Sequence, residues 1–279
     1  MTSSLDRTRP RVWIDTDVAL GAARGDVDDG FALAALFGAA RRGEIDLIGV
    51  STVFGNTTAG ESETCALDLA ARAGVSVEIV RGGEKAGQAS SAAERIAFLP
   101  ERTELLCLGP LTNVATACHR DPGLPARVSL RAVGGNLSSR GFLPPIWPLE
   151  FNFFLDRQAA RFVLSRAWRD LTIYPLDVVR RLRVGREQLS ELARVSPLGK
   201  YIAVSSERWL SRSRWRYLAR NFPLWDLPPA LDVLDALGGT SRARTFTVGV
   251  RWLLATSQPM RCLTSFDPNI AWNRFLSLL

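Results

Sequence analysis

The sequence has few of the residues that form cross-links or carry acid–base chemistry. Its 279 residues include four cysteines, two lysines and a single histidine, His119. The cysteines form no Cys-x-x-Cys pair and are too few for a disulfide scaffold in a chain of this length, which favours a reducing cytoplasm. Because no Cys/His cluster exists, the sequence does not indicate a zinc site.

Long apolar runs are also missing. No run approaches the roughly 20 residues that a membrane span needs, and the polar segment Met1–Pro10 lacks the apolar core of a signal peptide. With 47% hydrophobic and 23% charged residues, the chain is not typical of a disordered protein. We expect a cytoplasmic protein without a membrane segment, consisting of a flexible tail over residues 1–11 and a single domain over residues 12–279.

The positive charge comes almost entirely from arginine. The net charge is +7, and only Lys85 and Lys200 among the 35 basic residues are lysines, which leaves 33 arginines. These arginines are spread along the chain and interleaved with 28 acidic residues, so we do not expect a nucleic-acid partner. An Arg/Trp-rich stripe in Glu207–Phe222 would suit single-stranded nucleic acid, but we favour a half-buried helix with snorkelling arginines. Its residues are Trp209, Arg212, Arg214, Trp215, Arg216, Tyr217 and Arg220.

Short β-branched runs alternate with alanine-rich stretches through the first two thirds of the chain. This alternation is typical of βαβ units and predicts an α/β fold, an open and mostly parallel sheet with helices on both faces. The predicted strands are Val12–Asp15, Asp46–Thr52, Val77–Val80, Glu104–Leu108, Ser129–Val133 and Leu171–Tyr174. The predicted helices include Asp28–Ala40, Glu61–Ala73 and Thr112–Arg120, and Val184–Asn221 is predicted to be mostly helical.

Polar residues and glycines follow the predicted strands, where the ligand crevice of an open parallel sheet lies. Five aspartates follow the first strand within fifteen residues, and their charges would repel one another strongly unless they shared a cation or a proton. All candidate donors are oxygens, which favours Ca²⁺ or Mg²⁺. Helix capping alone would explain one or two of these aspartates. The five are Asp15, Asp17, Asp26, Asp28 and Asp29.

Five blocks of sequence, in order, resemble the inosine–uridine nucleoside hydrolases. The segment Val12–Asp17 followed by Asp28-Asp29 is similar to the amino-terminal DxDxxxDD signature of that family. The other blocks are Gly49–Asn56, which ends in the GN motif, Leu108–Asn113 with the GPLTN loop, Val133–Gly135 with the GG pair, and Glu150–Asn152 with the EFN motif and Asp156. The resemblance extends from about residue 12 to about residue 235, and it implies Ca²⁺-dependent hydrolysis of ribonucleosides to free base and ribose.

The resemblance also implies roles for single residues. It assigns Ca²⁺ to Asp17, Asp29, the carbonyl of Thr112 and Asp226, and it assigns the ribose to Asp28, Glu150, Asn152 and Asp226. Asp17 would be the general base, and Asn56 and Asp15 would support the site. By resemblance alone, we expect a homo-oligomer, a dimer or a tetramer, that binds a small nucleoside.

The sequence departs from the family pattern at three places. Ten residues separate Asp17 from Asp28 where the signature has three, so Asp26 competes for one of the assigned positions. Trp225 stands before Asp226 where many members have a histidine that protonates the leaving base. We therefore expect Trp225 to stack on the base and to favour purines, although a packed core aromatic is the alternative, and we interpret His119 as structural. The segment Gly82–Leu99 is shorter than the usual loop above the base.

Two other functions remain open at this point. A ribose- or nucleoside-binding protein with little catalysis is compatible with the missing histidine, the short loop and the insertion. The segment Asp15–Val18 also resembles the nucleophile loop of haloacid-dehalogenase-like phosphatases, but neither Lys85 nor Lys200 lies in the motif that those enzymes need.

Overall fold

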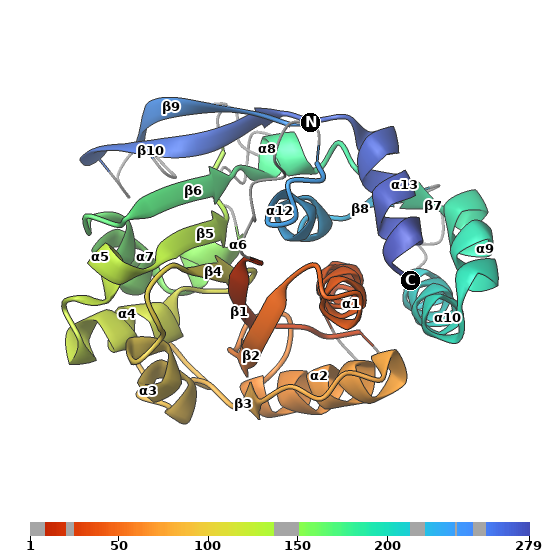
Figure 1. Ribbon diagram of the computed structural model, residues 1–279, viewed down its shortest axis with the longest axis horizontal. Coiled ribbons are helices and arrows are strands. Elements are labelled where there is room, and N and C mark those ends of the chain that lie inside the picture. The colour runs from red at the N-terminus through yellow and green to blue at the C-terminus, as the bar shows by residue number, and fades with distance from the viewer. Residues whose placement is uncertain (1–8, 21–24, 137–150, 213–220, 238, 248–254) are drawn as a thin grey trace, which may run out of the picture.

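The computed structural model describes residues 9–20, 25–136, 151–212, 221–237, 239–247 and 255–279. In this part of the chain, eight strands form one sheet in the order β3-β2-β1-β4-β5-β6-β10-β9 (Figure 1). All pairs are parallel except β10 with β9. The strands are β1 (Arg11–Thr16), β2 (Asp46–Thr52), β3 (Ile79–Val80), β4 (Thr103–Cys107), β5 (Ser129–Val133), β6 (Asp170–Tyr174), β9 (Thr240–Thr247) and β10 (Ala255–Ser265).

Helices cover both faces of the sheet, each over its own apolar core (Figure 1). One face carries α3 (Ser91–Ala97), α4 (Thr112–Arg120), the short α5 (Leu124–Arg127), α6 (Phe151–Leu155) and α7 (Arg157–Leu164). The other carries α1 (Asp28–Arg41), α2 (Ala59–Ala73), α8 (Leu176–Val179), α9 (Arg186–Val195), α10 (Pro197–Ser211), α12 (Leu227–Asp232) and α13 (Pro268–Leu278). The predicted α/β architecture is therefore confirmed.

Helix α1 lies at the centre of the second face. Twelve of its fourteen residues are buried, including Phe31, Leu33 and Phe37, because α2, α12 and α13 pack around it. A helix that is buried on nearly all sides places its first turn, which contains Asp28 and Asp29, inside the protein rather than at the surface.

The six predicted strands are present with small shifts, and some elements were missed. β1 begins at Arg11, within the segment predicted as a tail. Strands β9 and β10 were not predicted because their sequences are rich in polar residues and β10 contains Pro259. The segment predicted as mostly helical does contain α9 and α10, but it is bounded by a two-stranded antiparallel sheet of β7 (Arg183–Gly185) and β8 (Asn221–Pro223).

The described residues also bear on the cysteines and on the membrane. No disulfide joins the four cysteines, which are all described and all buried. Among the described helices, none combines the length and the apolar character that crossing a membrane requires.

Candidate functional site

The order in which the strands follow one another along the chain reverses at β1, so the loops that leave the carboxyl ends of β1 and its neighbours diverge there. Strands β2 and β3 follow on one side of β1, and β4, β5 and β6 follow on the other. In open α/β sheets this switch point is where ligands bind. Asp15 and Asp17 lie at the end of β1, Asp28 and Asp29 begin α1, and Asp226 directly precedes α12. Asp226 is separated by about two hundred residues from the others, yet α12 packs against α1.

Three of these carboxylates form a tight cluster. Oxygens of Asp28, Asp29 and Asp226 all lie within 4.8 Å of one another, and the three residues are buried. Asp28 and Asp29 lie in the first turn of α1, where the helix dipole favours negative charge. Asp28 also accepts a hydrogen bond from the backbone nitrogen of Trp225 at 3.1 Å, which ties the segment before α12 to α1.

Burial raises the pKa of five buried aspartates, Asp15, Asp17, Asp28, Asp29 and Asp226. The pKa of Asp29 rises to about 6 and that of Asp15 to about 7, in both cases mainly because burial disfavours the charged form. For Asp17, Asp28 and Asp226, burial and then repulsion between the neighbouring carboxylates raise the pKa well above its usual value. A divalent cation among these groups would reverse both effects, because it stabilises the ionised form.

Asp17 lies between two glycine-containing turns. Its Oδ2 accepts a hydrogen bond from the backbone of Asn56 at 2.7 Å, whereas its Oδ1 is buried without a hydrogen-bond partner in the described structure. A Cβ atom at Gly55 would lie 2.0 Å from Oδ2, and one at Gly109 would lie 3.0 Å from Oδ1. The glycines of the GN and GPLTN motifs are thus explained by the close approach of this carboxylate, and its unpaired oxygen is available to a ligand.

Asn56 connects Asp17 to the cluster. While its backbone binds Asp17, its Nδ2 donates to Oδ2 of Asp29 at 3.1 Å, and Thr16 Oγ1 donates to the other Asp29 oxygen at 2.5 Å. Thr16 was not singled out from the sequence. Successive residues of a strand point to opposite faces, so its place between Asp15 and Asp17 gave no signal that it binds Asp29.

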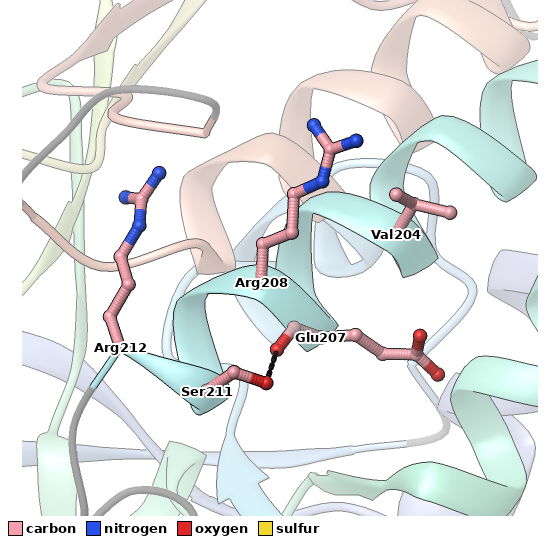
Figure 2. Close-up of a pocket in the computed structure, with 5 residues that line it drawn as sticks. All are labelled: Val204, Glu207, Arg208, Ser211 and Arg212. Atoms are coloured by element: carbon pink, nitrogen blue, oxygen red, sulfur yellow. Dashed lines mark hydrogen bonds between the residues drawn. The ribbon is translucent and has the colours of Figure 1, made fainter.

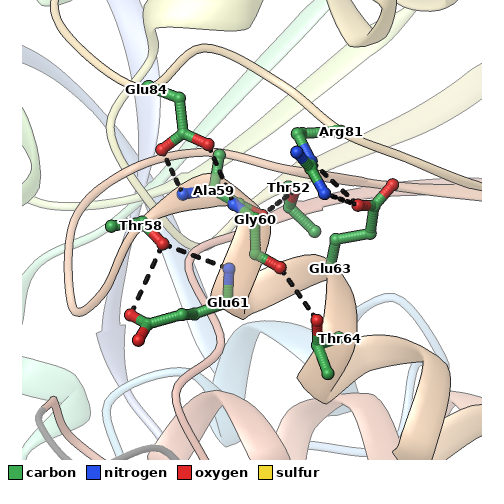
Figure 3. Close-up of polar contacts among 9 residues, drawn as sticks. All are labelled: Thr52, Thr58, Ala59, Gly60, Glu61, Glu63, Thr64, Arg81 and Glu84. Carbon is green, nitrogen blue, oxygen red and sulfur yellow. Dashed lines mark hydrogen bonds and ion pairs between the residues drawn. The ribbon is translucent and has the colours of Figure 1, made fainter.

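The segment that follows Asn56 is held by several hydrogen bonds (Figure 3). Thr58 caps α2 by accepting from the backbone of Glu61 at 3.1 Å. The carboxylate of Glu84, in the loop after β3, accepts from Ala59 N at 2.9 Å and from Gly60 N at 3.0 Å. Glu84 belongs to the segment Gly82–Leu99, which therefore binds the start of α2.

Asp15, in β1, is bound by side chains from two other segments. Its Oδ1 accepts hydrogen bonds from Ser51 Oγ at 2.6 Å and from Asn113 Nδ2 at 2.9 Å. Asn113 in turn accepts from Gly83 N at 3.0 Å and from Ser90 Oγ at 2.9 Å. Asn113 of the GPLTN loop therefore joins β1 to the loop after β3, a role that the sequence did not predict.

Gly109 of the GPLTN loop approaches the Asp17 carboxylate, and Thr112 of the same loop begins α4. The Thr112 carbonyl accepts from Thr116 Oγ1 at 3.0 Å and so lies along α4, and the Thr112 hydroxyl donates to Asp156 Oδ2 at 2.6 Å. Asn152 lies at the ends of β4 and β5, where its Nδ2 donates to Leu108 O at 2.6 Å and to Val133 O at 3.3 Å. Glu150 lies outside the described residues.

The insertion after Asp17 is packed into the fold at both ends. Leu20 is buried beside α1, and its carbonyl accepts from Cys65 Sγ at 2.5 Å. At the other end, Gly25 O accepts from Trp209 Nε1 at 2.7 Å. Asp26 is half-buried and accepts from the backbone of Val27 at 2.8 Å. The tight cluster comprises Asp28, Asp29 and Asp226, and the Asp26 carboxylate lies near enough to raise the pKa of both Asp28 and Asp29.

Trp225, the predicted base-stacking residue, and His119, interpreted as structural, lie in different surroundings. Trp225 is half-buried at the margin of the larger core, directly before Asp226. His119 is exposed at the end of α4, where it stacks on Phe162 with ring centroids 3.9 Å apart. His119 lies near the C-terminal end of α4, about 10 Å along the helix from Thr112.

The Arg/Trp-rich stripe lies only partly in the described structure. Trp209 is buried against Phe222, and Arg212 lines a shallow pocket on one side of α10 (Figure 2). The rest of that lining is Val204, Glu207, Arg208 and Ser211, so the pocket contains none of the predicted site residues. Arg214, Trp215, Arg216, Tyr217 and Arg220 lie outside the described residues.

The donor set fits a hard divalent cation. Ca²⁺ binds oxygens at about 2.3–2.6 Å, so two ligand oxygens on one ion are at most about 5 Å apart, which the spacing within the cluster satisfies. The structure groups Asp28 with Asp29 and Asp226, whereas the resemblance assigned Asp17 to the ion and Asp28 to the ribose. Asp17 contributes its buried unpaired oxygen beside this group.

Comparison with known proteins gives one consistent result. A profile of the inosine-uridine preferring nucleoside hydrolases matches residues 12–266. The chain is 27% identical over 219 residues to a probable uridine nucleosidase 1 of Oryza sativa subsp. japonica, covering 66% of this chain and 64% of that protein. It is also 27% identical over 217 residues to uridine nucleosidase 1 of Arabidopsis thaliana, covering 65% of this chain and 61% of that protein. The matched region thus spans just under two thirds of these curated relatives.

A solved plant nucleoside hydrolase has the same fold. It superposes with a TM-score of 0.76 at 19% identity, over 97% of this chain and 99% of the other.

Proposed function

Because this chain belongs to the inosine-uridine preferring nucleoside hydrolase family, we propose that it hydrolyses the N-glycosidic bond of ribonucleosides to give free base and ribose. The observation that carries the proposal is the convergence of Asp28, Asp29 and Asp226 beside the unpaired oxygen of Asp17. Buried acidic groups in such numbers are costly to a fold and are typical of a site that binds a cation and polar substrate groups.

We assign Ca²⁺ to this cluster, with Asp28, Asp29 and Asp226 as the carboxylate ligands and Asp17 at its border. When bound, the cation would bind vicinal ribose hydroxyls and increase the acidity of a neighbouring water molecule. Carboxylate oxygens not used by the cation would accept hydrogen bonds from the ribose hydroxyls. Their negative charge would also favour the positive charge that develops on the sugar as the glycosidic bond breaks.

Asp17 is the proposed general base. Its buried Oδ1 would accept a proton from the attacking water, while Asn56 holds Oδ2 in place. A new bond forms between the water oxygen and the anomeric carbon, the glycosidic bond breaks, and its electron pair leaves with the base. Asn56 also binds Asp29, so it fixes the position of the general base, Asp17, relative to the carboxylate cluster.

The leaving base shapes the proposed specificity. Trp225 is placed next to Asp226, and a stacked purine can take a proton at N7 from solvent, whereas a pyrimidine needs a donor at its oxygen. With His119 exposed on the far end of α4, we assign no side-chain donor among the described residues. We therefore propose a preference for purine nucleosides, by stacking on Trp225.

Release of free ribose from a panel of nucleosides tests this proposal. Inosine, adenosine and guanosine should be hydrolysed faster than uridine and cytidine in the presence of Ca²⁺, and Asp17→Asn should serve as the inactive control. Faster hydrolysis of uridine would contradict the purine preference but not the reaction. If no nucleoside releases ribose, the alternative of a nucleoside-binding protein with little catalysis replaces hydrolysis.

The cellular context remains a proposal as well. We expect a cytoplasmic homo-oligomer that acts on small nucleosides, without a nucleic-acid partner. The two lysines on which a phosphatase would depend, Lys85 and Lys200, are both exposed on the surface.

A further inference from the structure

A polar network lies between helix α12 and the sheet. Arg131 of β5 donates through Nε to Glu104 of β4 at 2.7 Å and through Nη1 to Asp232 at 2.9 Å. The same Nη1 donates to the hydroxyl of Tyr174 of β6 at 2.8 Å, and that hydroxyl donates to Asp232 Oδ2 at 2.6 Å. Tyr174 is fully buried, and the Arg131 side chain is only 14% exposed.

The donor and the acceptor of the hydrogen bond between Tyr174 and Asp232 are defined. Burial raises the pKa of the Tyr174 hydroxyl well above its ordinary value, so the hydroxyl keeps its proton and donates it to Asp232. Charge-assisted hydrogen bonds in a poorly solvated place are short and strongly oriented. Asp232 is therefore held by two donors that come from two neighbouring strands.

Asp232 is the last residue of α12, and Asp226 directly precedes the first. At a rise of about 1.5 Å per residue, the two carboxylates lie at opposite ends of a helix about 9 Å long. The residues between them, such as Leu227, Ala230 and Leu231, are apolar and buried. Apolar contacts with α1 and the hydrogen bond from Trp225 N to Asp28 hold the start of α12, whereas Arg131 and Tyr174 hold its end through directional hydrogen bonds.

Tyr174 also contacts the carboxyl edge through its backbone. Its carbonyl accepts a hydrogen bond from Gly134 at 3.2 Å, in the Gly-Gly turn after β5. Tyr174 thus binds the far end of α12 through its hydroxyl and a turn beside the site through its backbone, and Tyr174→Phe removes only the first of these contacts.

We propose that Arg131, Tyr174 and Asp232 are positioning residues, which hold α12 so that the Asp226 carboxylate stays in the cluster with Asp28 and Asp29. The effect on turnover rests on the proposed function, whereas the effect on cation binding does not. Displacing a reacting group by about 1 Å costs up to about 10²-fold in rate. We expect about tenfold from loss of the single hydroxyl, because Arg131 still holds Asp232.

The test is Tyr174→Phe, which removes the hydroxyl and keeps the ring. The matched control is Tyr201→Phe, because the Tyr201 hydroxyl also binds an aspartate, Asp68, but on the surface between α10 and α2. Ca²⁺ affinity is measured by competition between the loaded protein and a fluorescent chelator. Ribose release supplies kcat and KM, and thermal melting in excess chelator supplies stability.

Tyr174→Phe should weaken Ca²⁺ binding about tenfold and lower kcat more than it raises KM. Tyr201→Phe should stay within twofold of wild type in Ca²⁺ affinity and in kcat. Should Tyr174→Phe fail to fold, Asp232→Asn and Arg131→Lys take its place, and Arg131→Lys should bind Ca²⁺ better than Arg131→Gln. Ca²⁺ affinity within twofold of wild type in Tyr174→Phe and Asp232→Asn would overturn the proposal, even if both proteins melt earlier. Absence of ribose release in the wild type would refute the proposed function, and the Ca²⁺ measurement would still decide the role of the network.

Discussion

Replacement of Asp29 by asparagine should remove most of the stabilisation that Ca²⁺ confers. The amide side chain would keep an acceptor for Thr16 Oγ1 but not the one for Asn56 Nδ2, so the change removes one negative charge and one hydrogen bond from the cluster. Breaking a buried charge pair by removing one partner costs about 3–5 kcal/mol. The lower value corresponds to a Kd for Ca²⁺ weakened by about 10²-fold.

The expected shift in melting temperature follows from mass action. At a Ca²⁺ concentration of 100 times Kd, binding stabilises the folded protein by about 2.7 kcal/mol. Unfolding 279 residues has an entropy of about 0.6 kcal/mol/K, so Tm should rise by about 4–5 °C in the wild type. At the same concentration, Asp29→Asn retains about 0.4 kcal/mol, which is a shift below about 1 °C.

Differential scanning fluorimetry with excess chelator and then with Ca²⁺ measures this difference. The chelated Asp29→Asn protein and the chelated wild type should have similar stability, because neutralising a carboxylate next to two others offsets the hydrogen bond lost from Asn56 Nδ2. The matched control is Asp26→Asn, which keeps the acceptor for Val27 N and should retain nearly the full shift. A full shift in Asp29→Asn, or its loss in Asp26→Asn, would show that the cation site is not the cluster described above.

Three further predictions follow from the same site. With chelator present, the free energy of unfolding should fall as the pH rises from about 4 to above 7. In the folded protein Asp29 and Asp15 have a pKa of about 6 and about 7, whereas in the unfolded chain they lose their protons near pH 4. A melting temperature that increases over this pH range would contradict the buried, cation-free carboxyl groups. Asp17→Asn should lower kcat by about 10²-fold or more, as for loss of a general base, with little change in the Kd for ribose; unchanged kcat refutes its role. Trp225→Ala should remove about 1–3 kcal/mol of base stacking, which lowers kcat/KM for inosine about 5- to 150-fold and changes kcat/KM for uridine less. Equal losses for both nucleosides would indicate a packing role for Trp225.

The parallel part of the fold was predictable because its strands are short β-branched runs between amphipathic or alanine-rich helices. The β10 strand pairs with β6 through Arg261 and Cys262 only, and its remaining partner is β9. Neither strand has an apolar run or a regular alternation, so tertiary pairing rather than local sequence determines them. The same holds for β7, whose three residues pair with Asn221–Pro223 nearly forty positions later.

The identity of the clustered aspartates was partly predictable. The apolar pattern at Phe31, Leu33 and Phe37 defines where α1 begins, and this placed Asp28 and Asp29 in its first turn in spite of the insertion. The contact of Asn56 with both Asp17 and Asp29 was not predictable, because the GN motif shows no sign of which carboxylate each donor reaches.

The assignment of the Thr112 carbonyl to Ca²⁺, which the resemblance implies, stays a prediction. A backbone carbonyl is chemically the same at every residue of the GPLTN loop, so side-chain identity gives no information about which one faces the site. Whether a carbonyl lies along a helix or at a strand end depends on where the helix begins. Here α4 begins at Thr112, whose carbonyl accepts a hydrogen bond from Thr116 and keeps a second lone pair for a ligand.

The placement of Asp226 depends on contacts that no local pattern encodes. Its helix, α12, has six residues, two of which are prolines, and it is too short to be stable by its own hydrogen bonds. It exists because α1 covers its apolar side and because Arg131 and Tyr174 bind its end. The carboxylate cluster therefore requires that α1 pack on α12 and that β5 and β6 be paired. Any substitution that loosens these elements should reduce cation binding before it unfolds the protein.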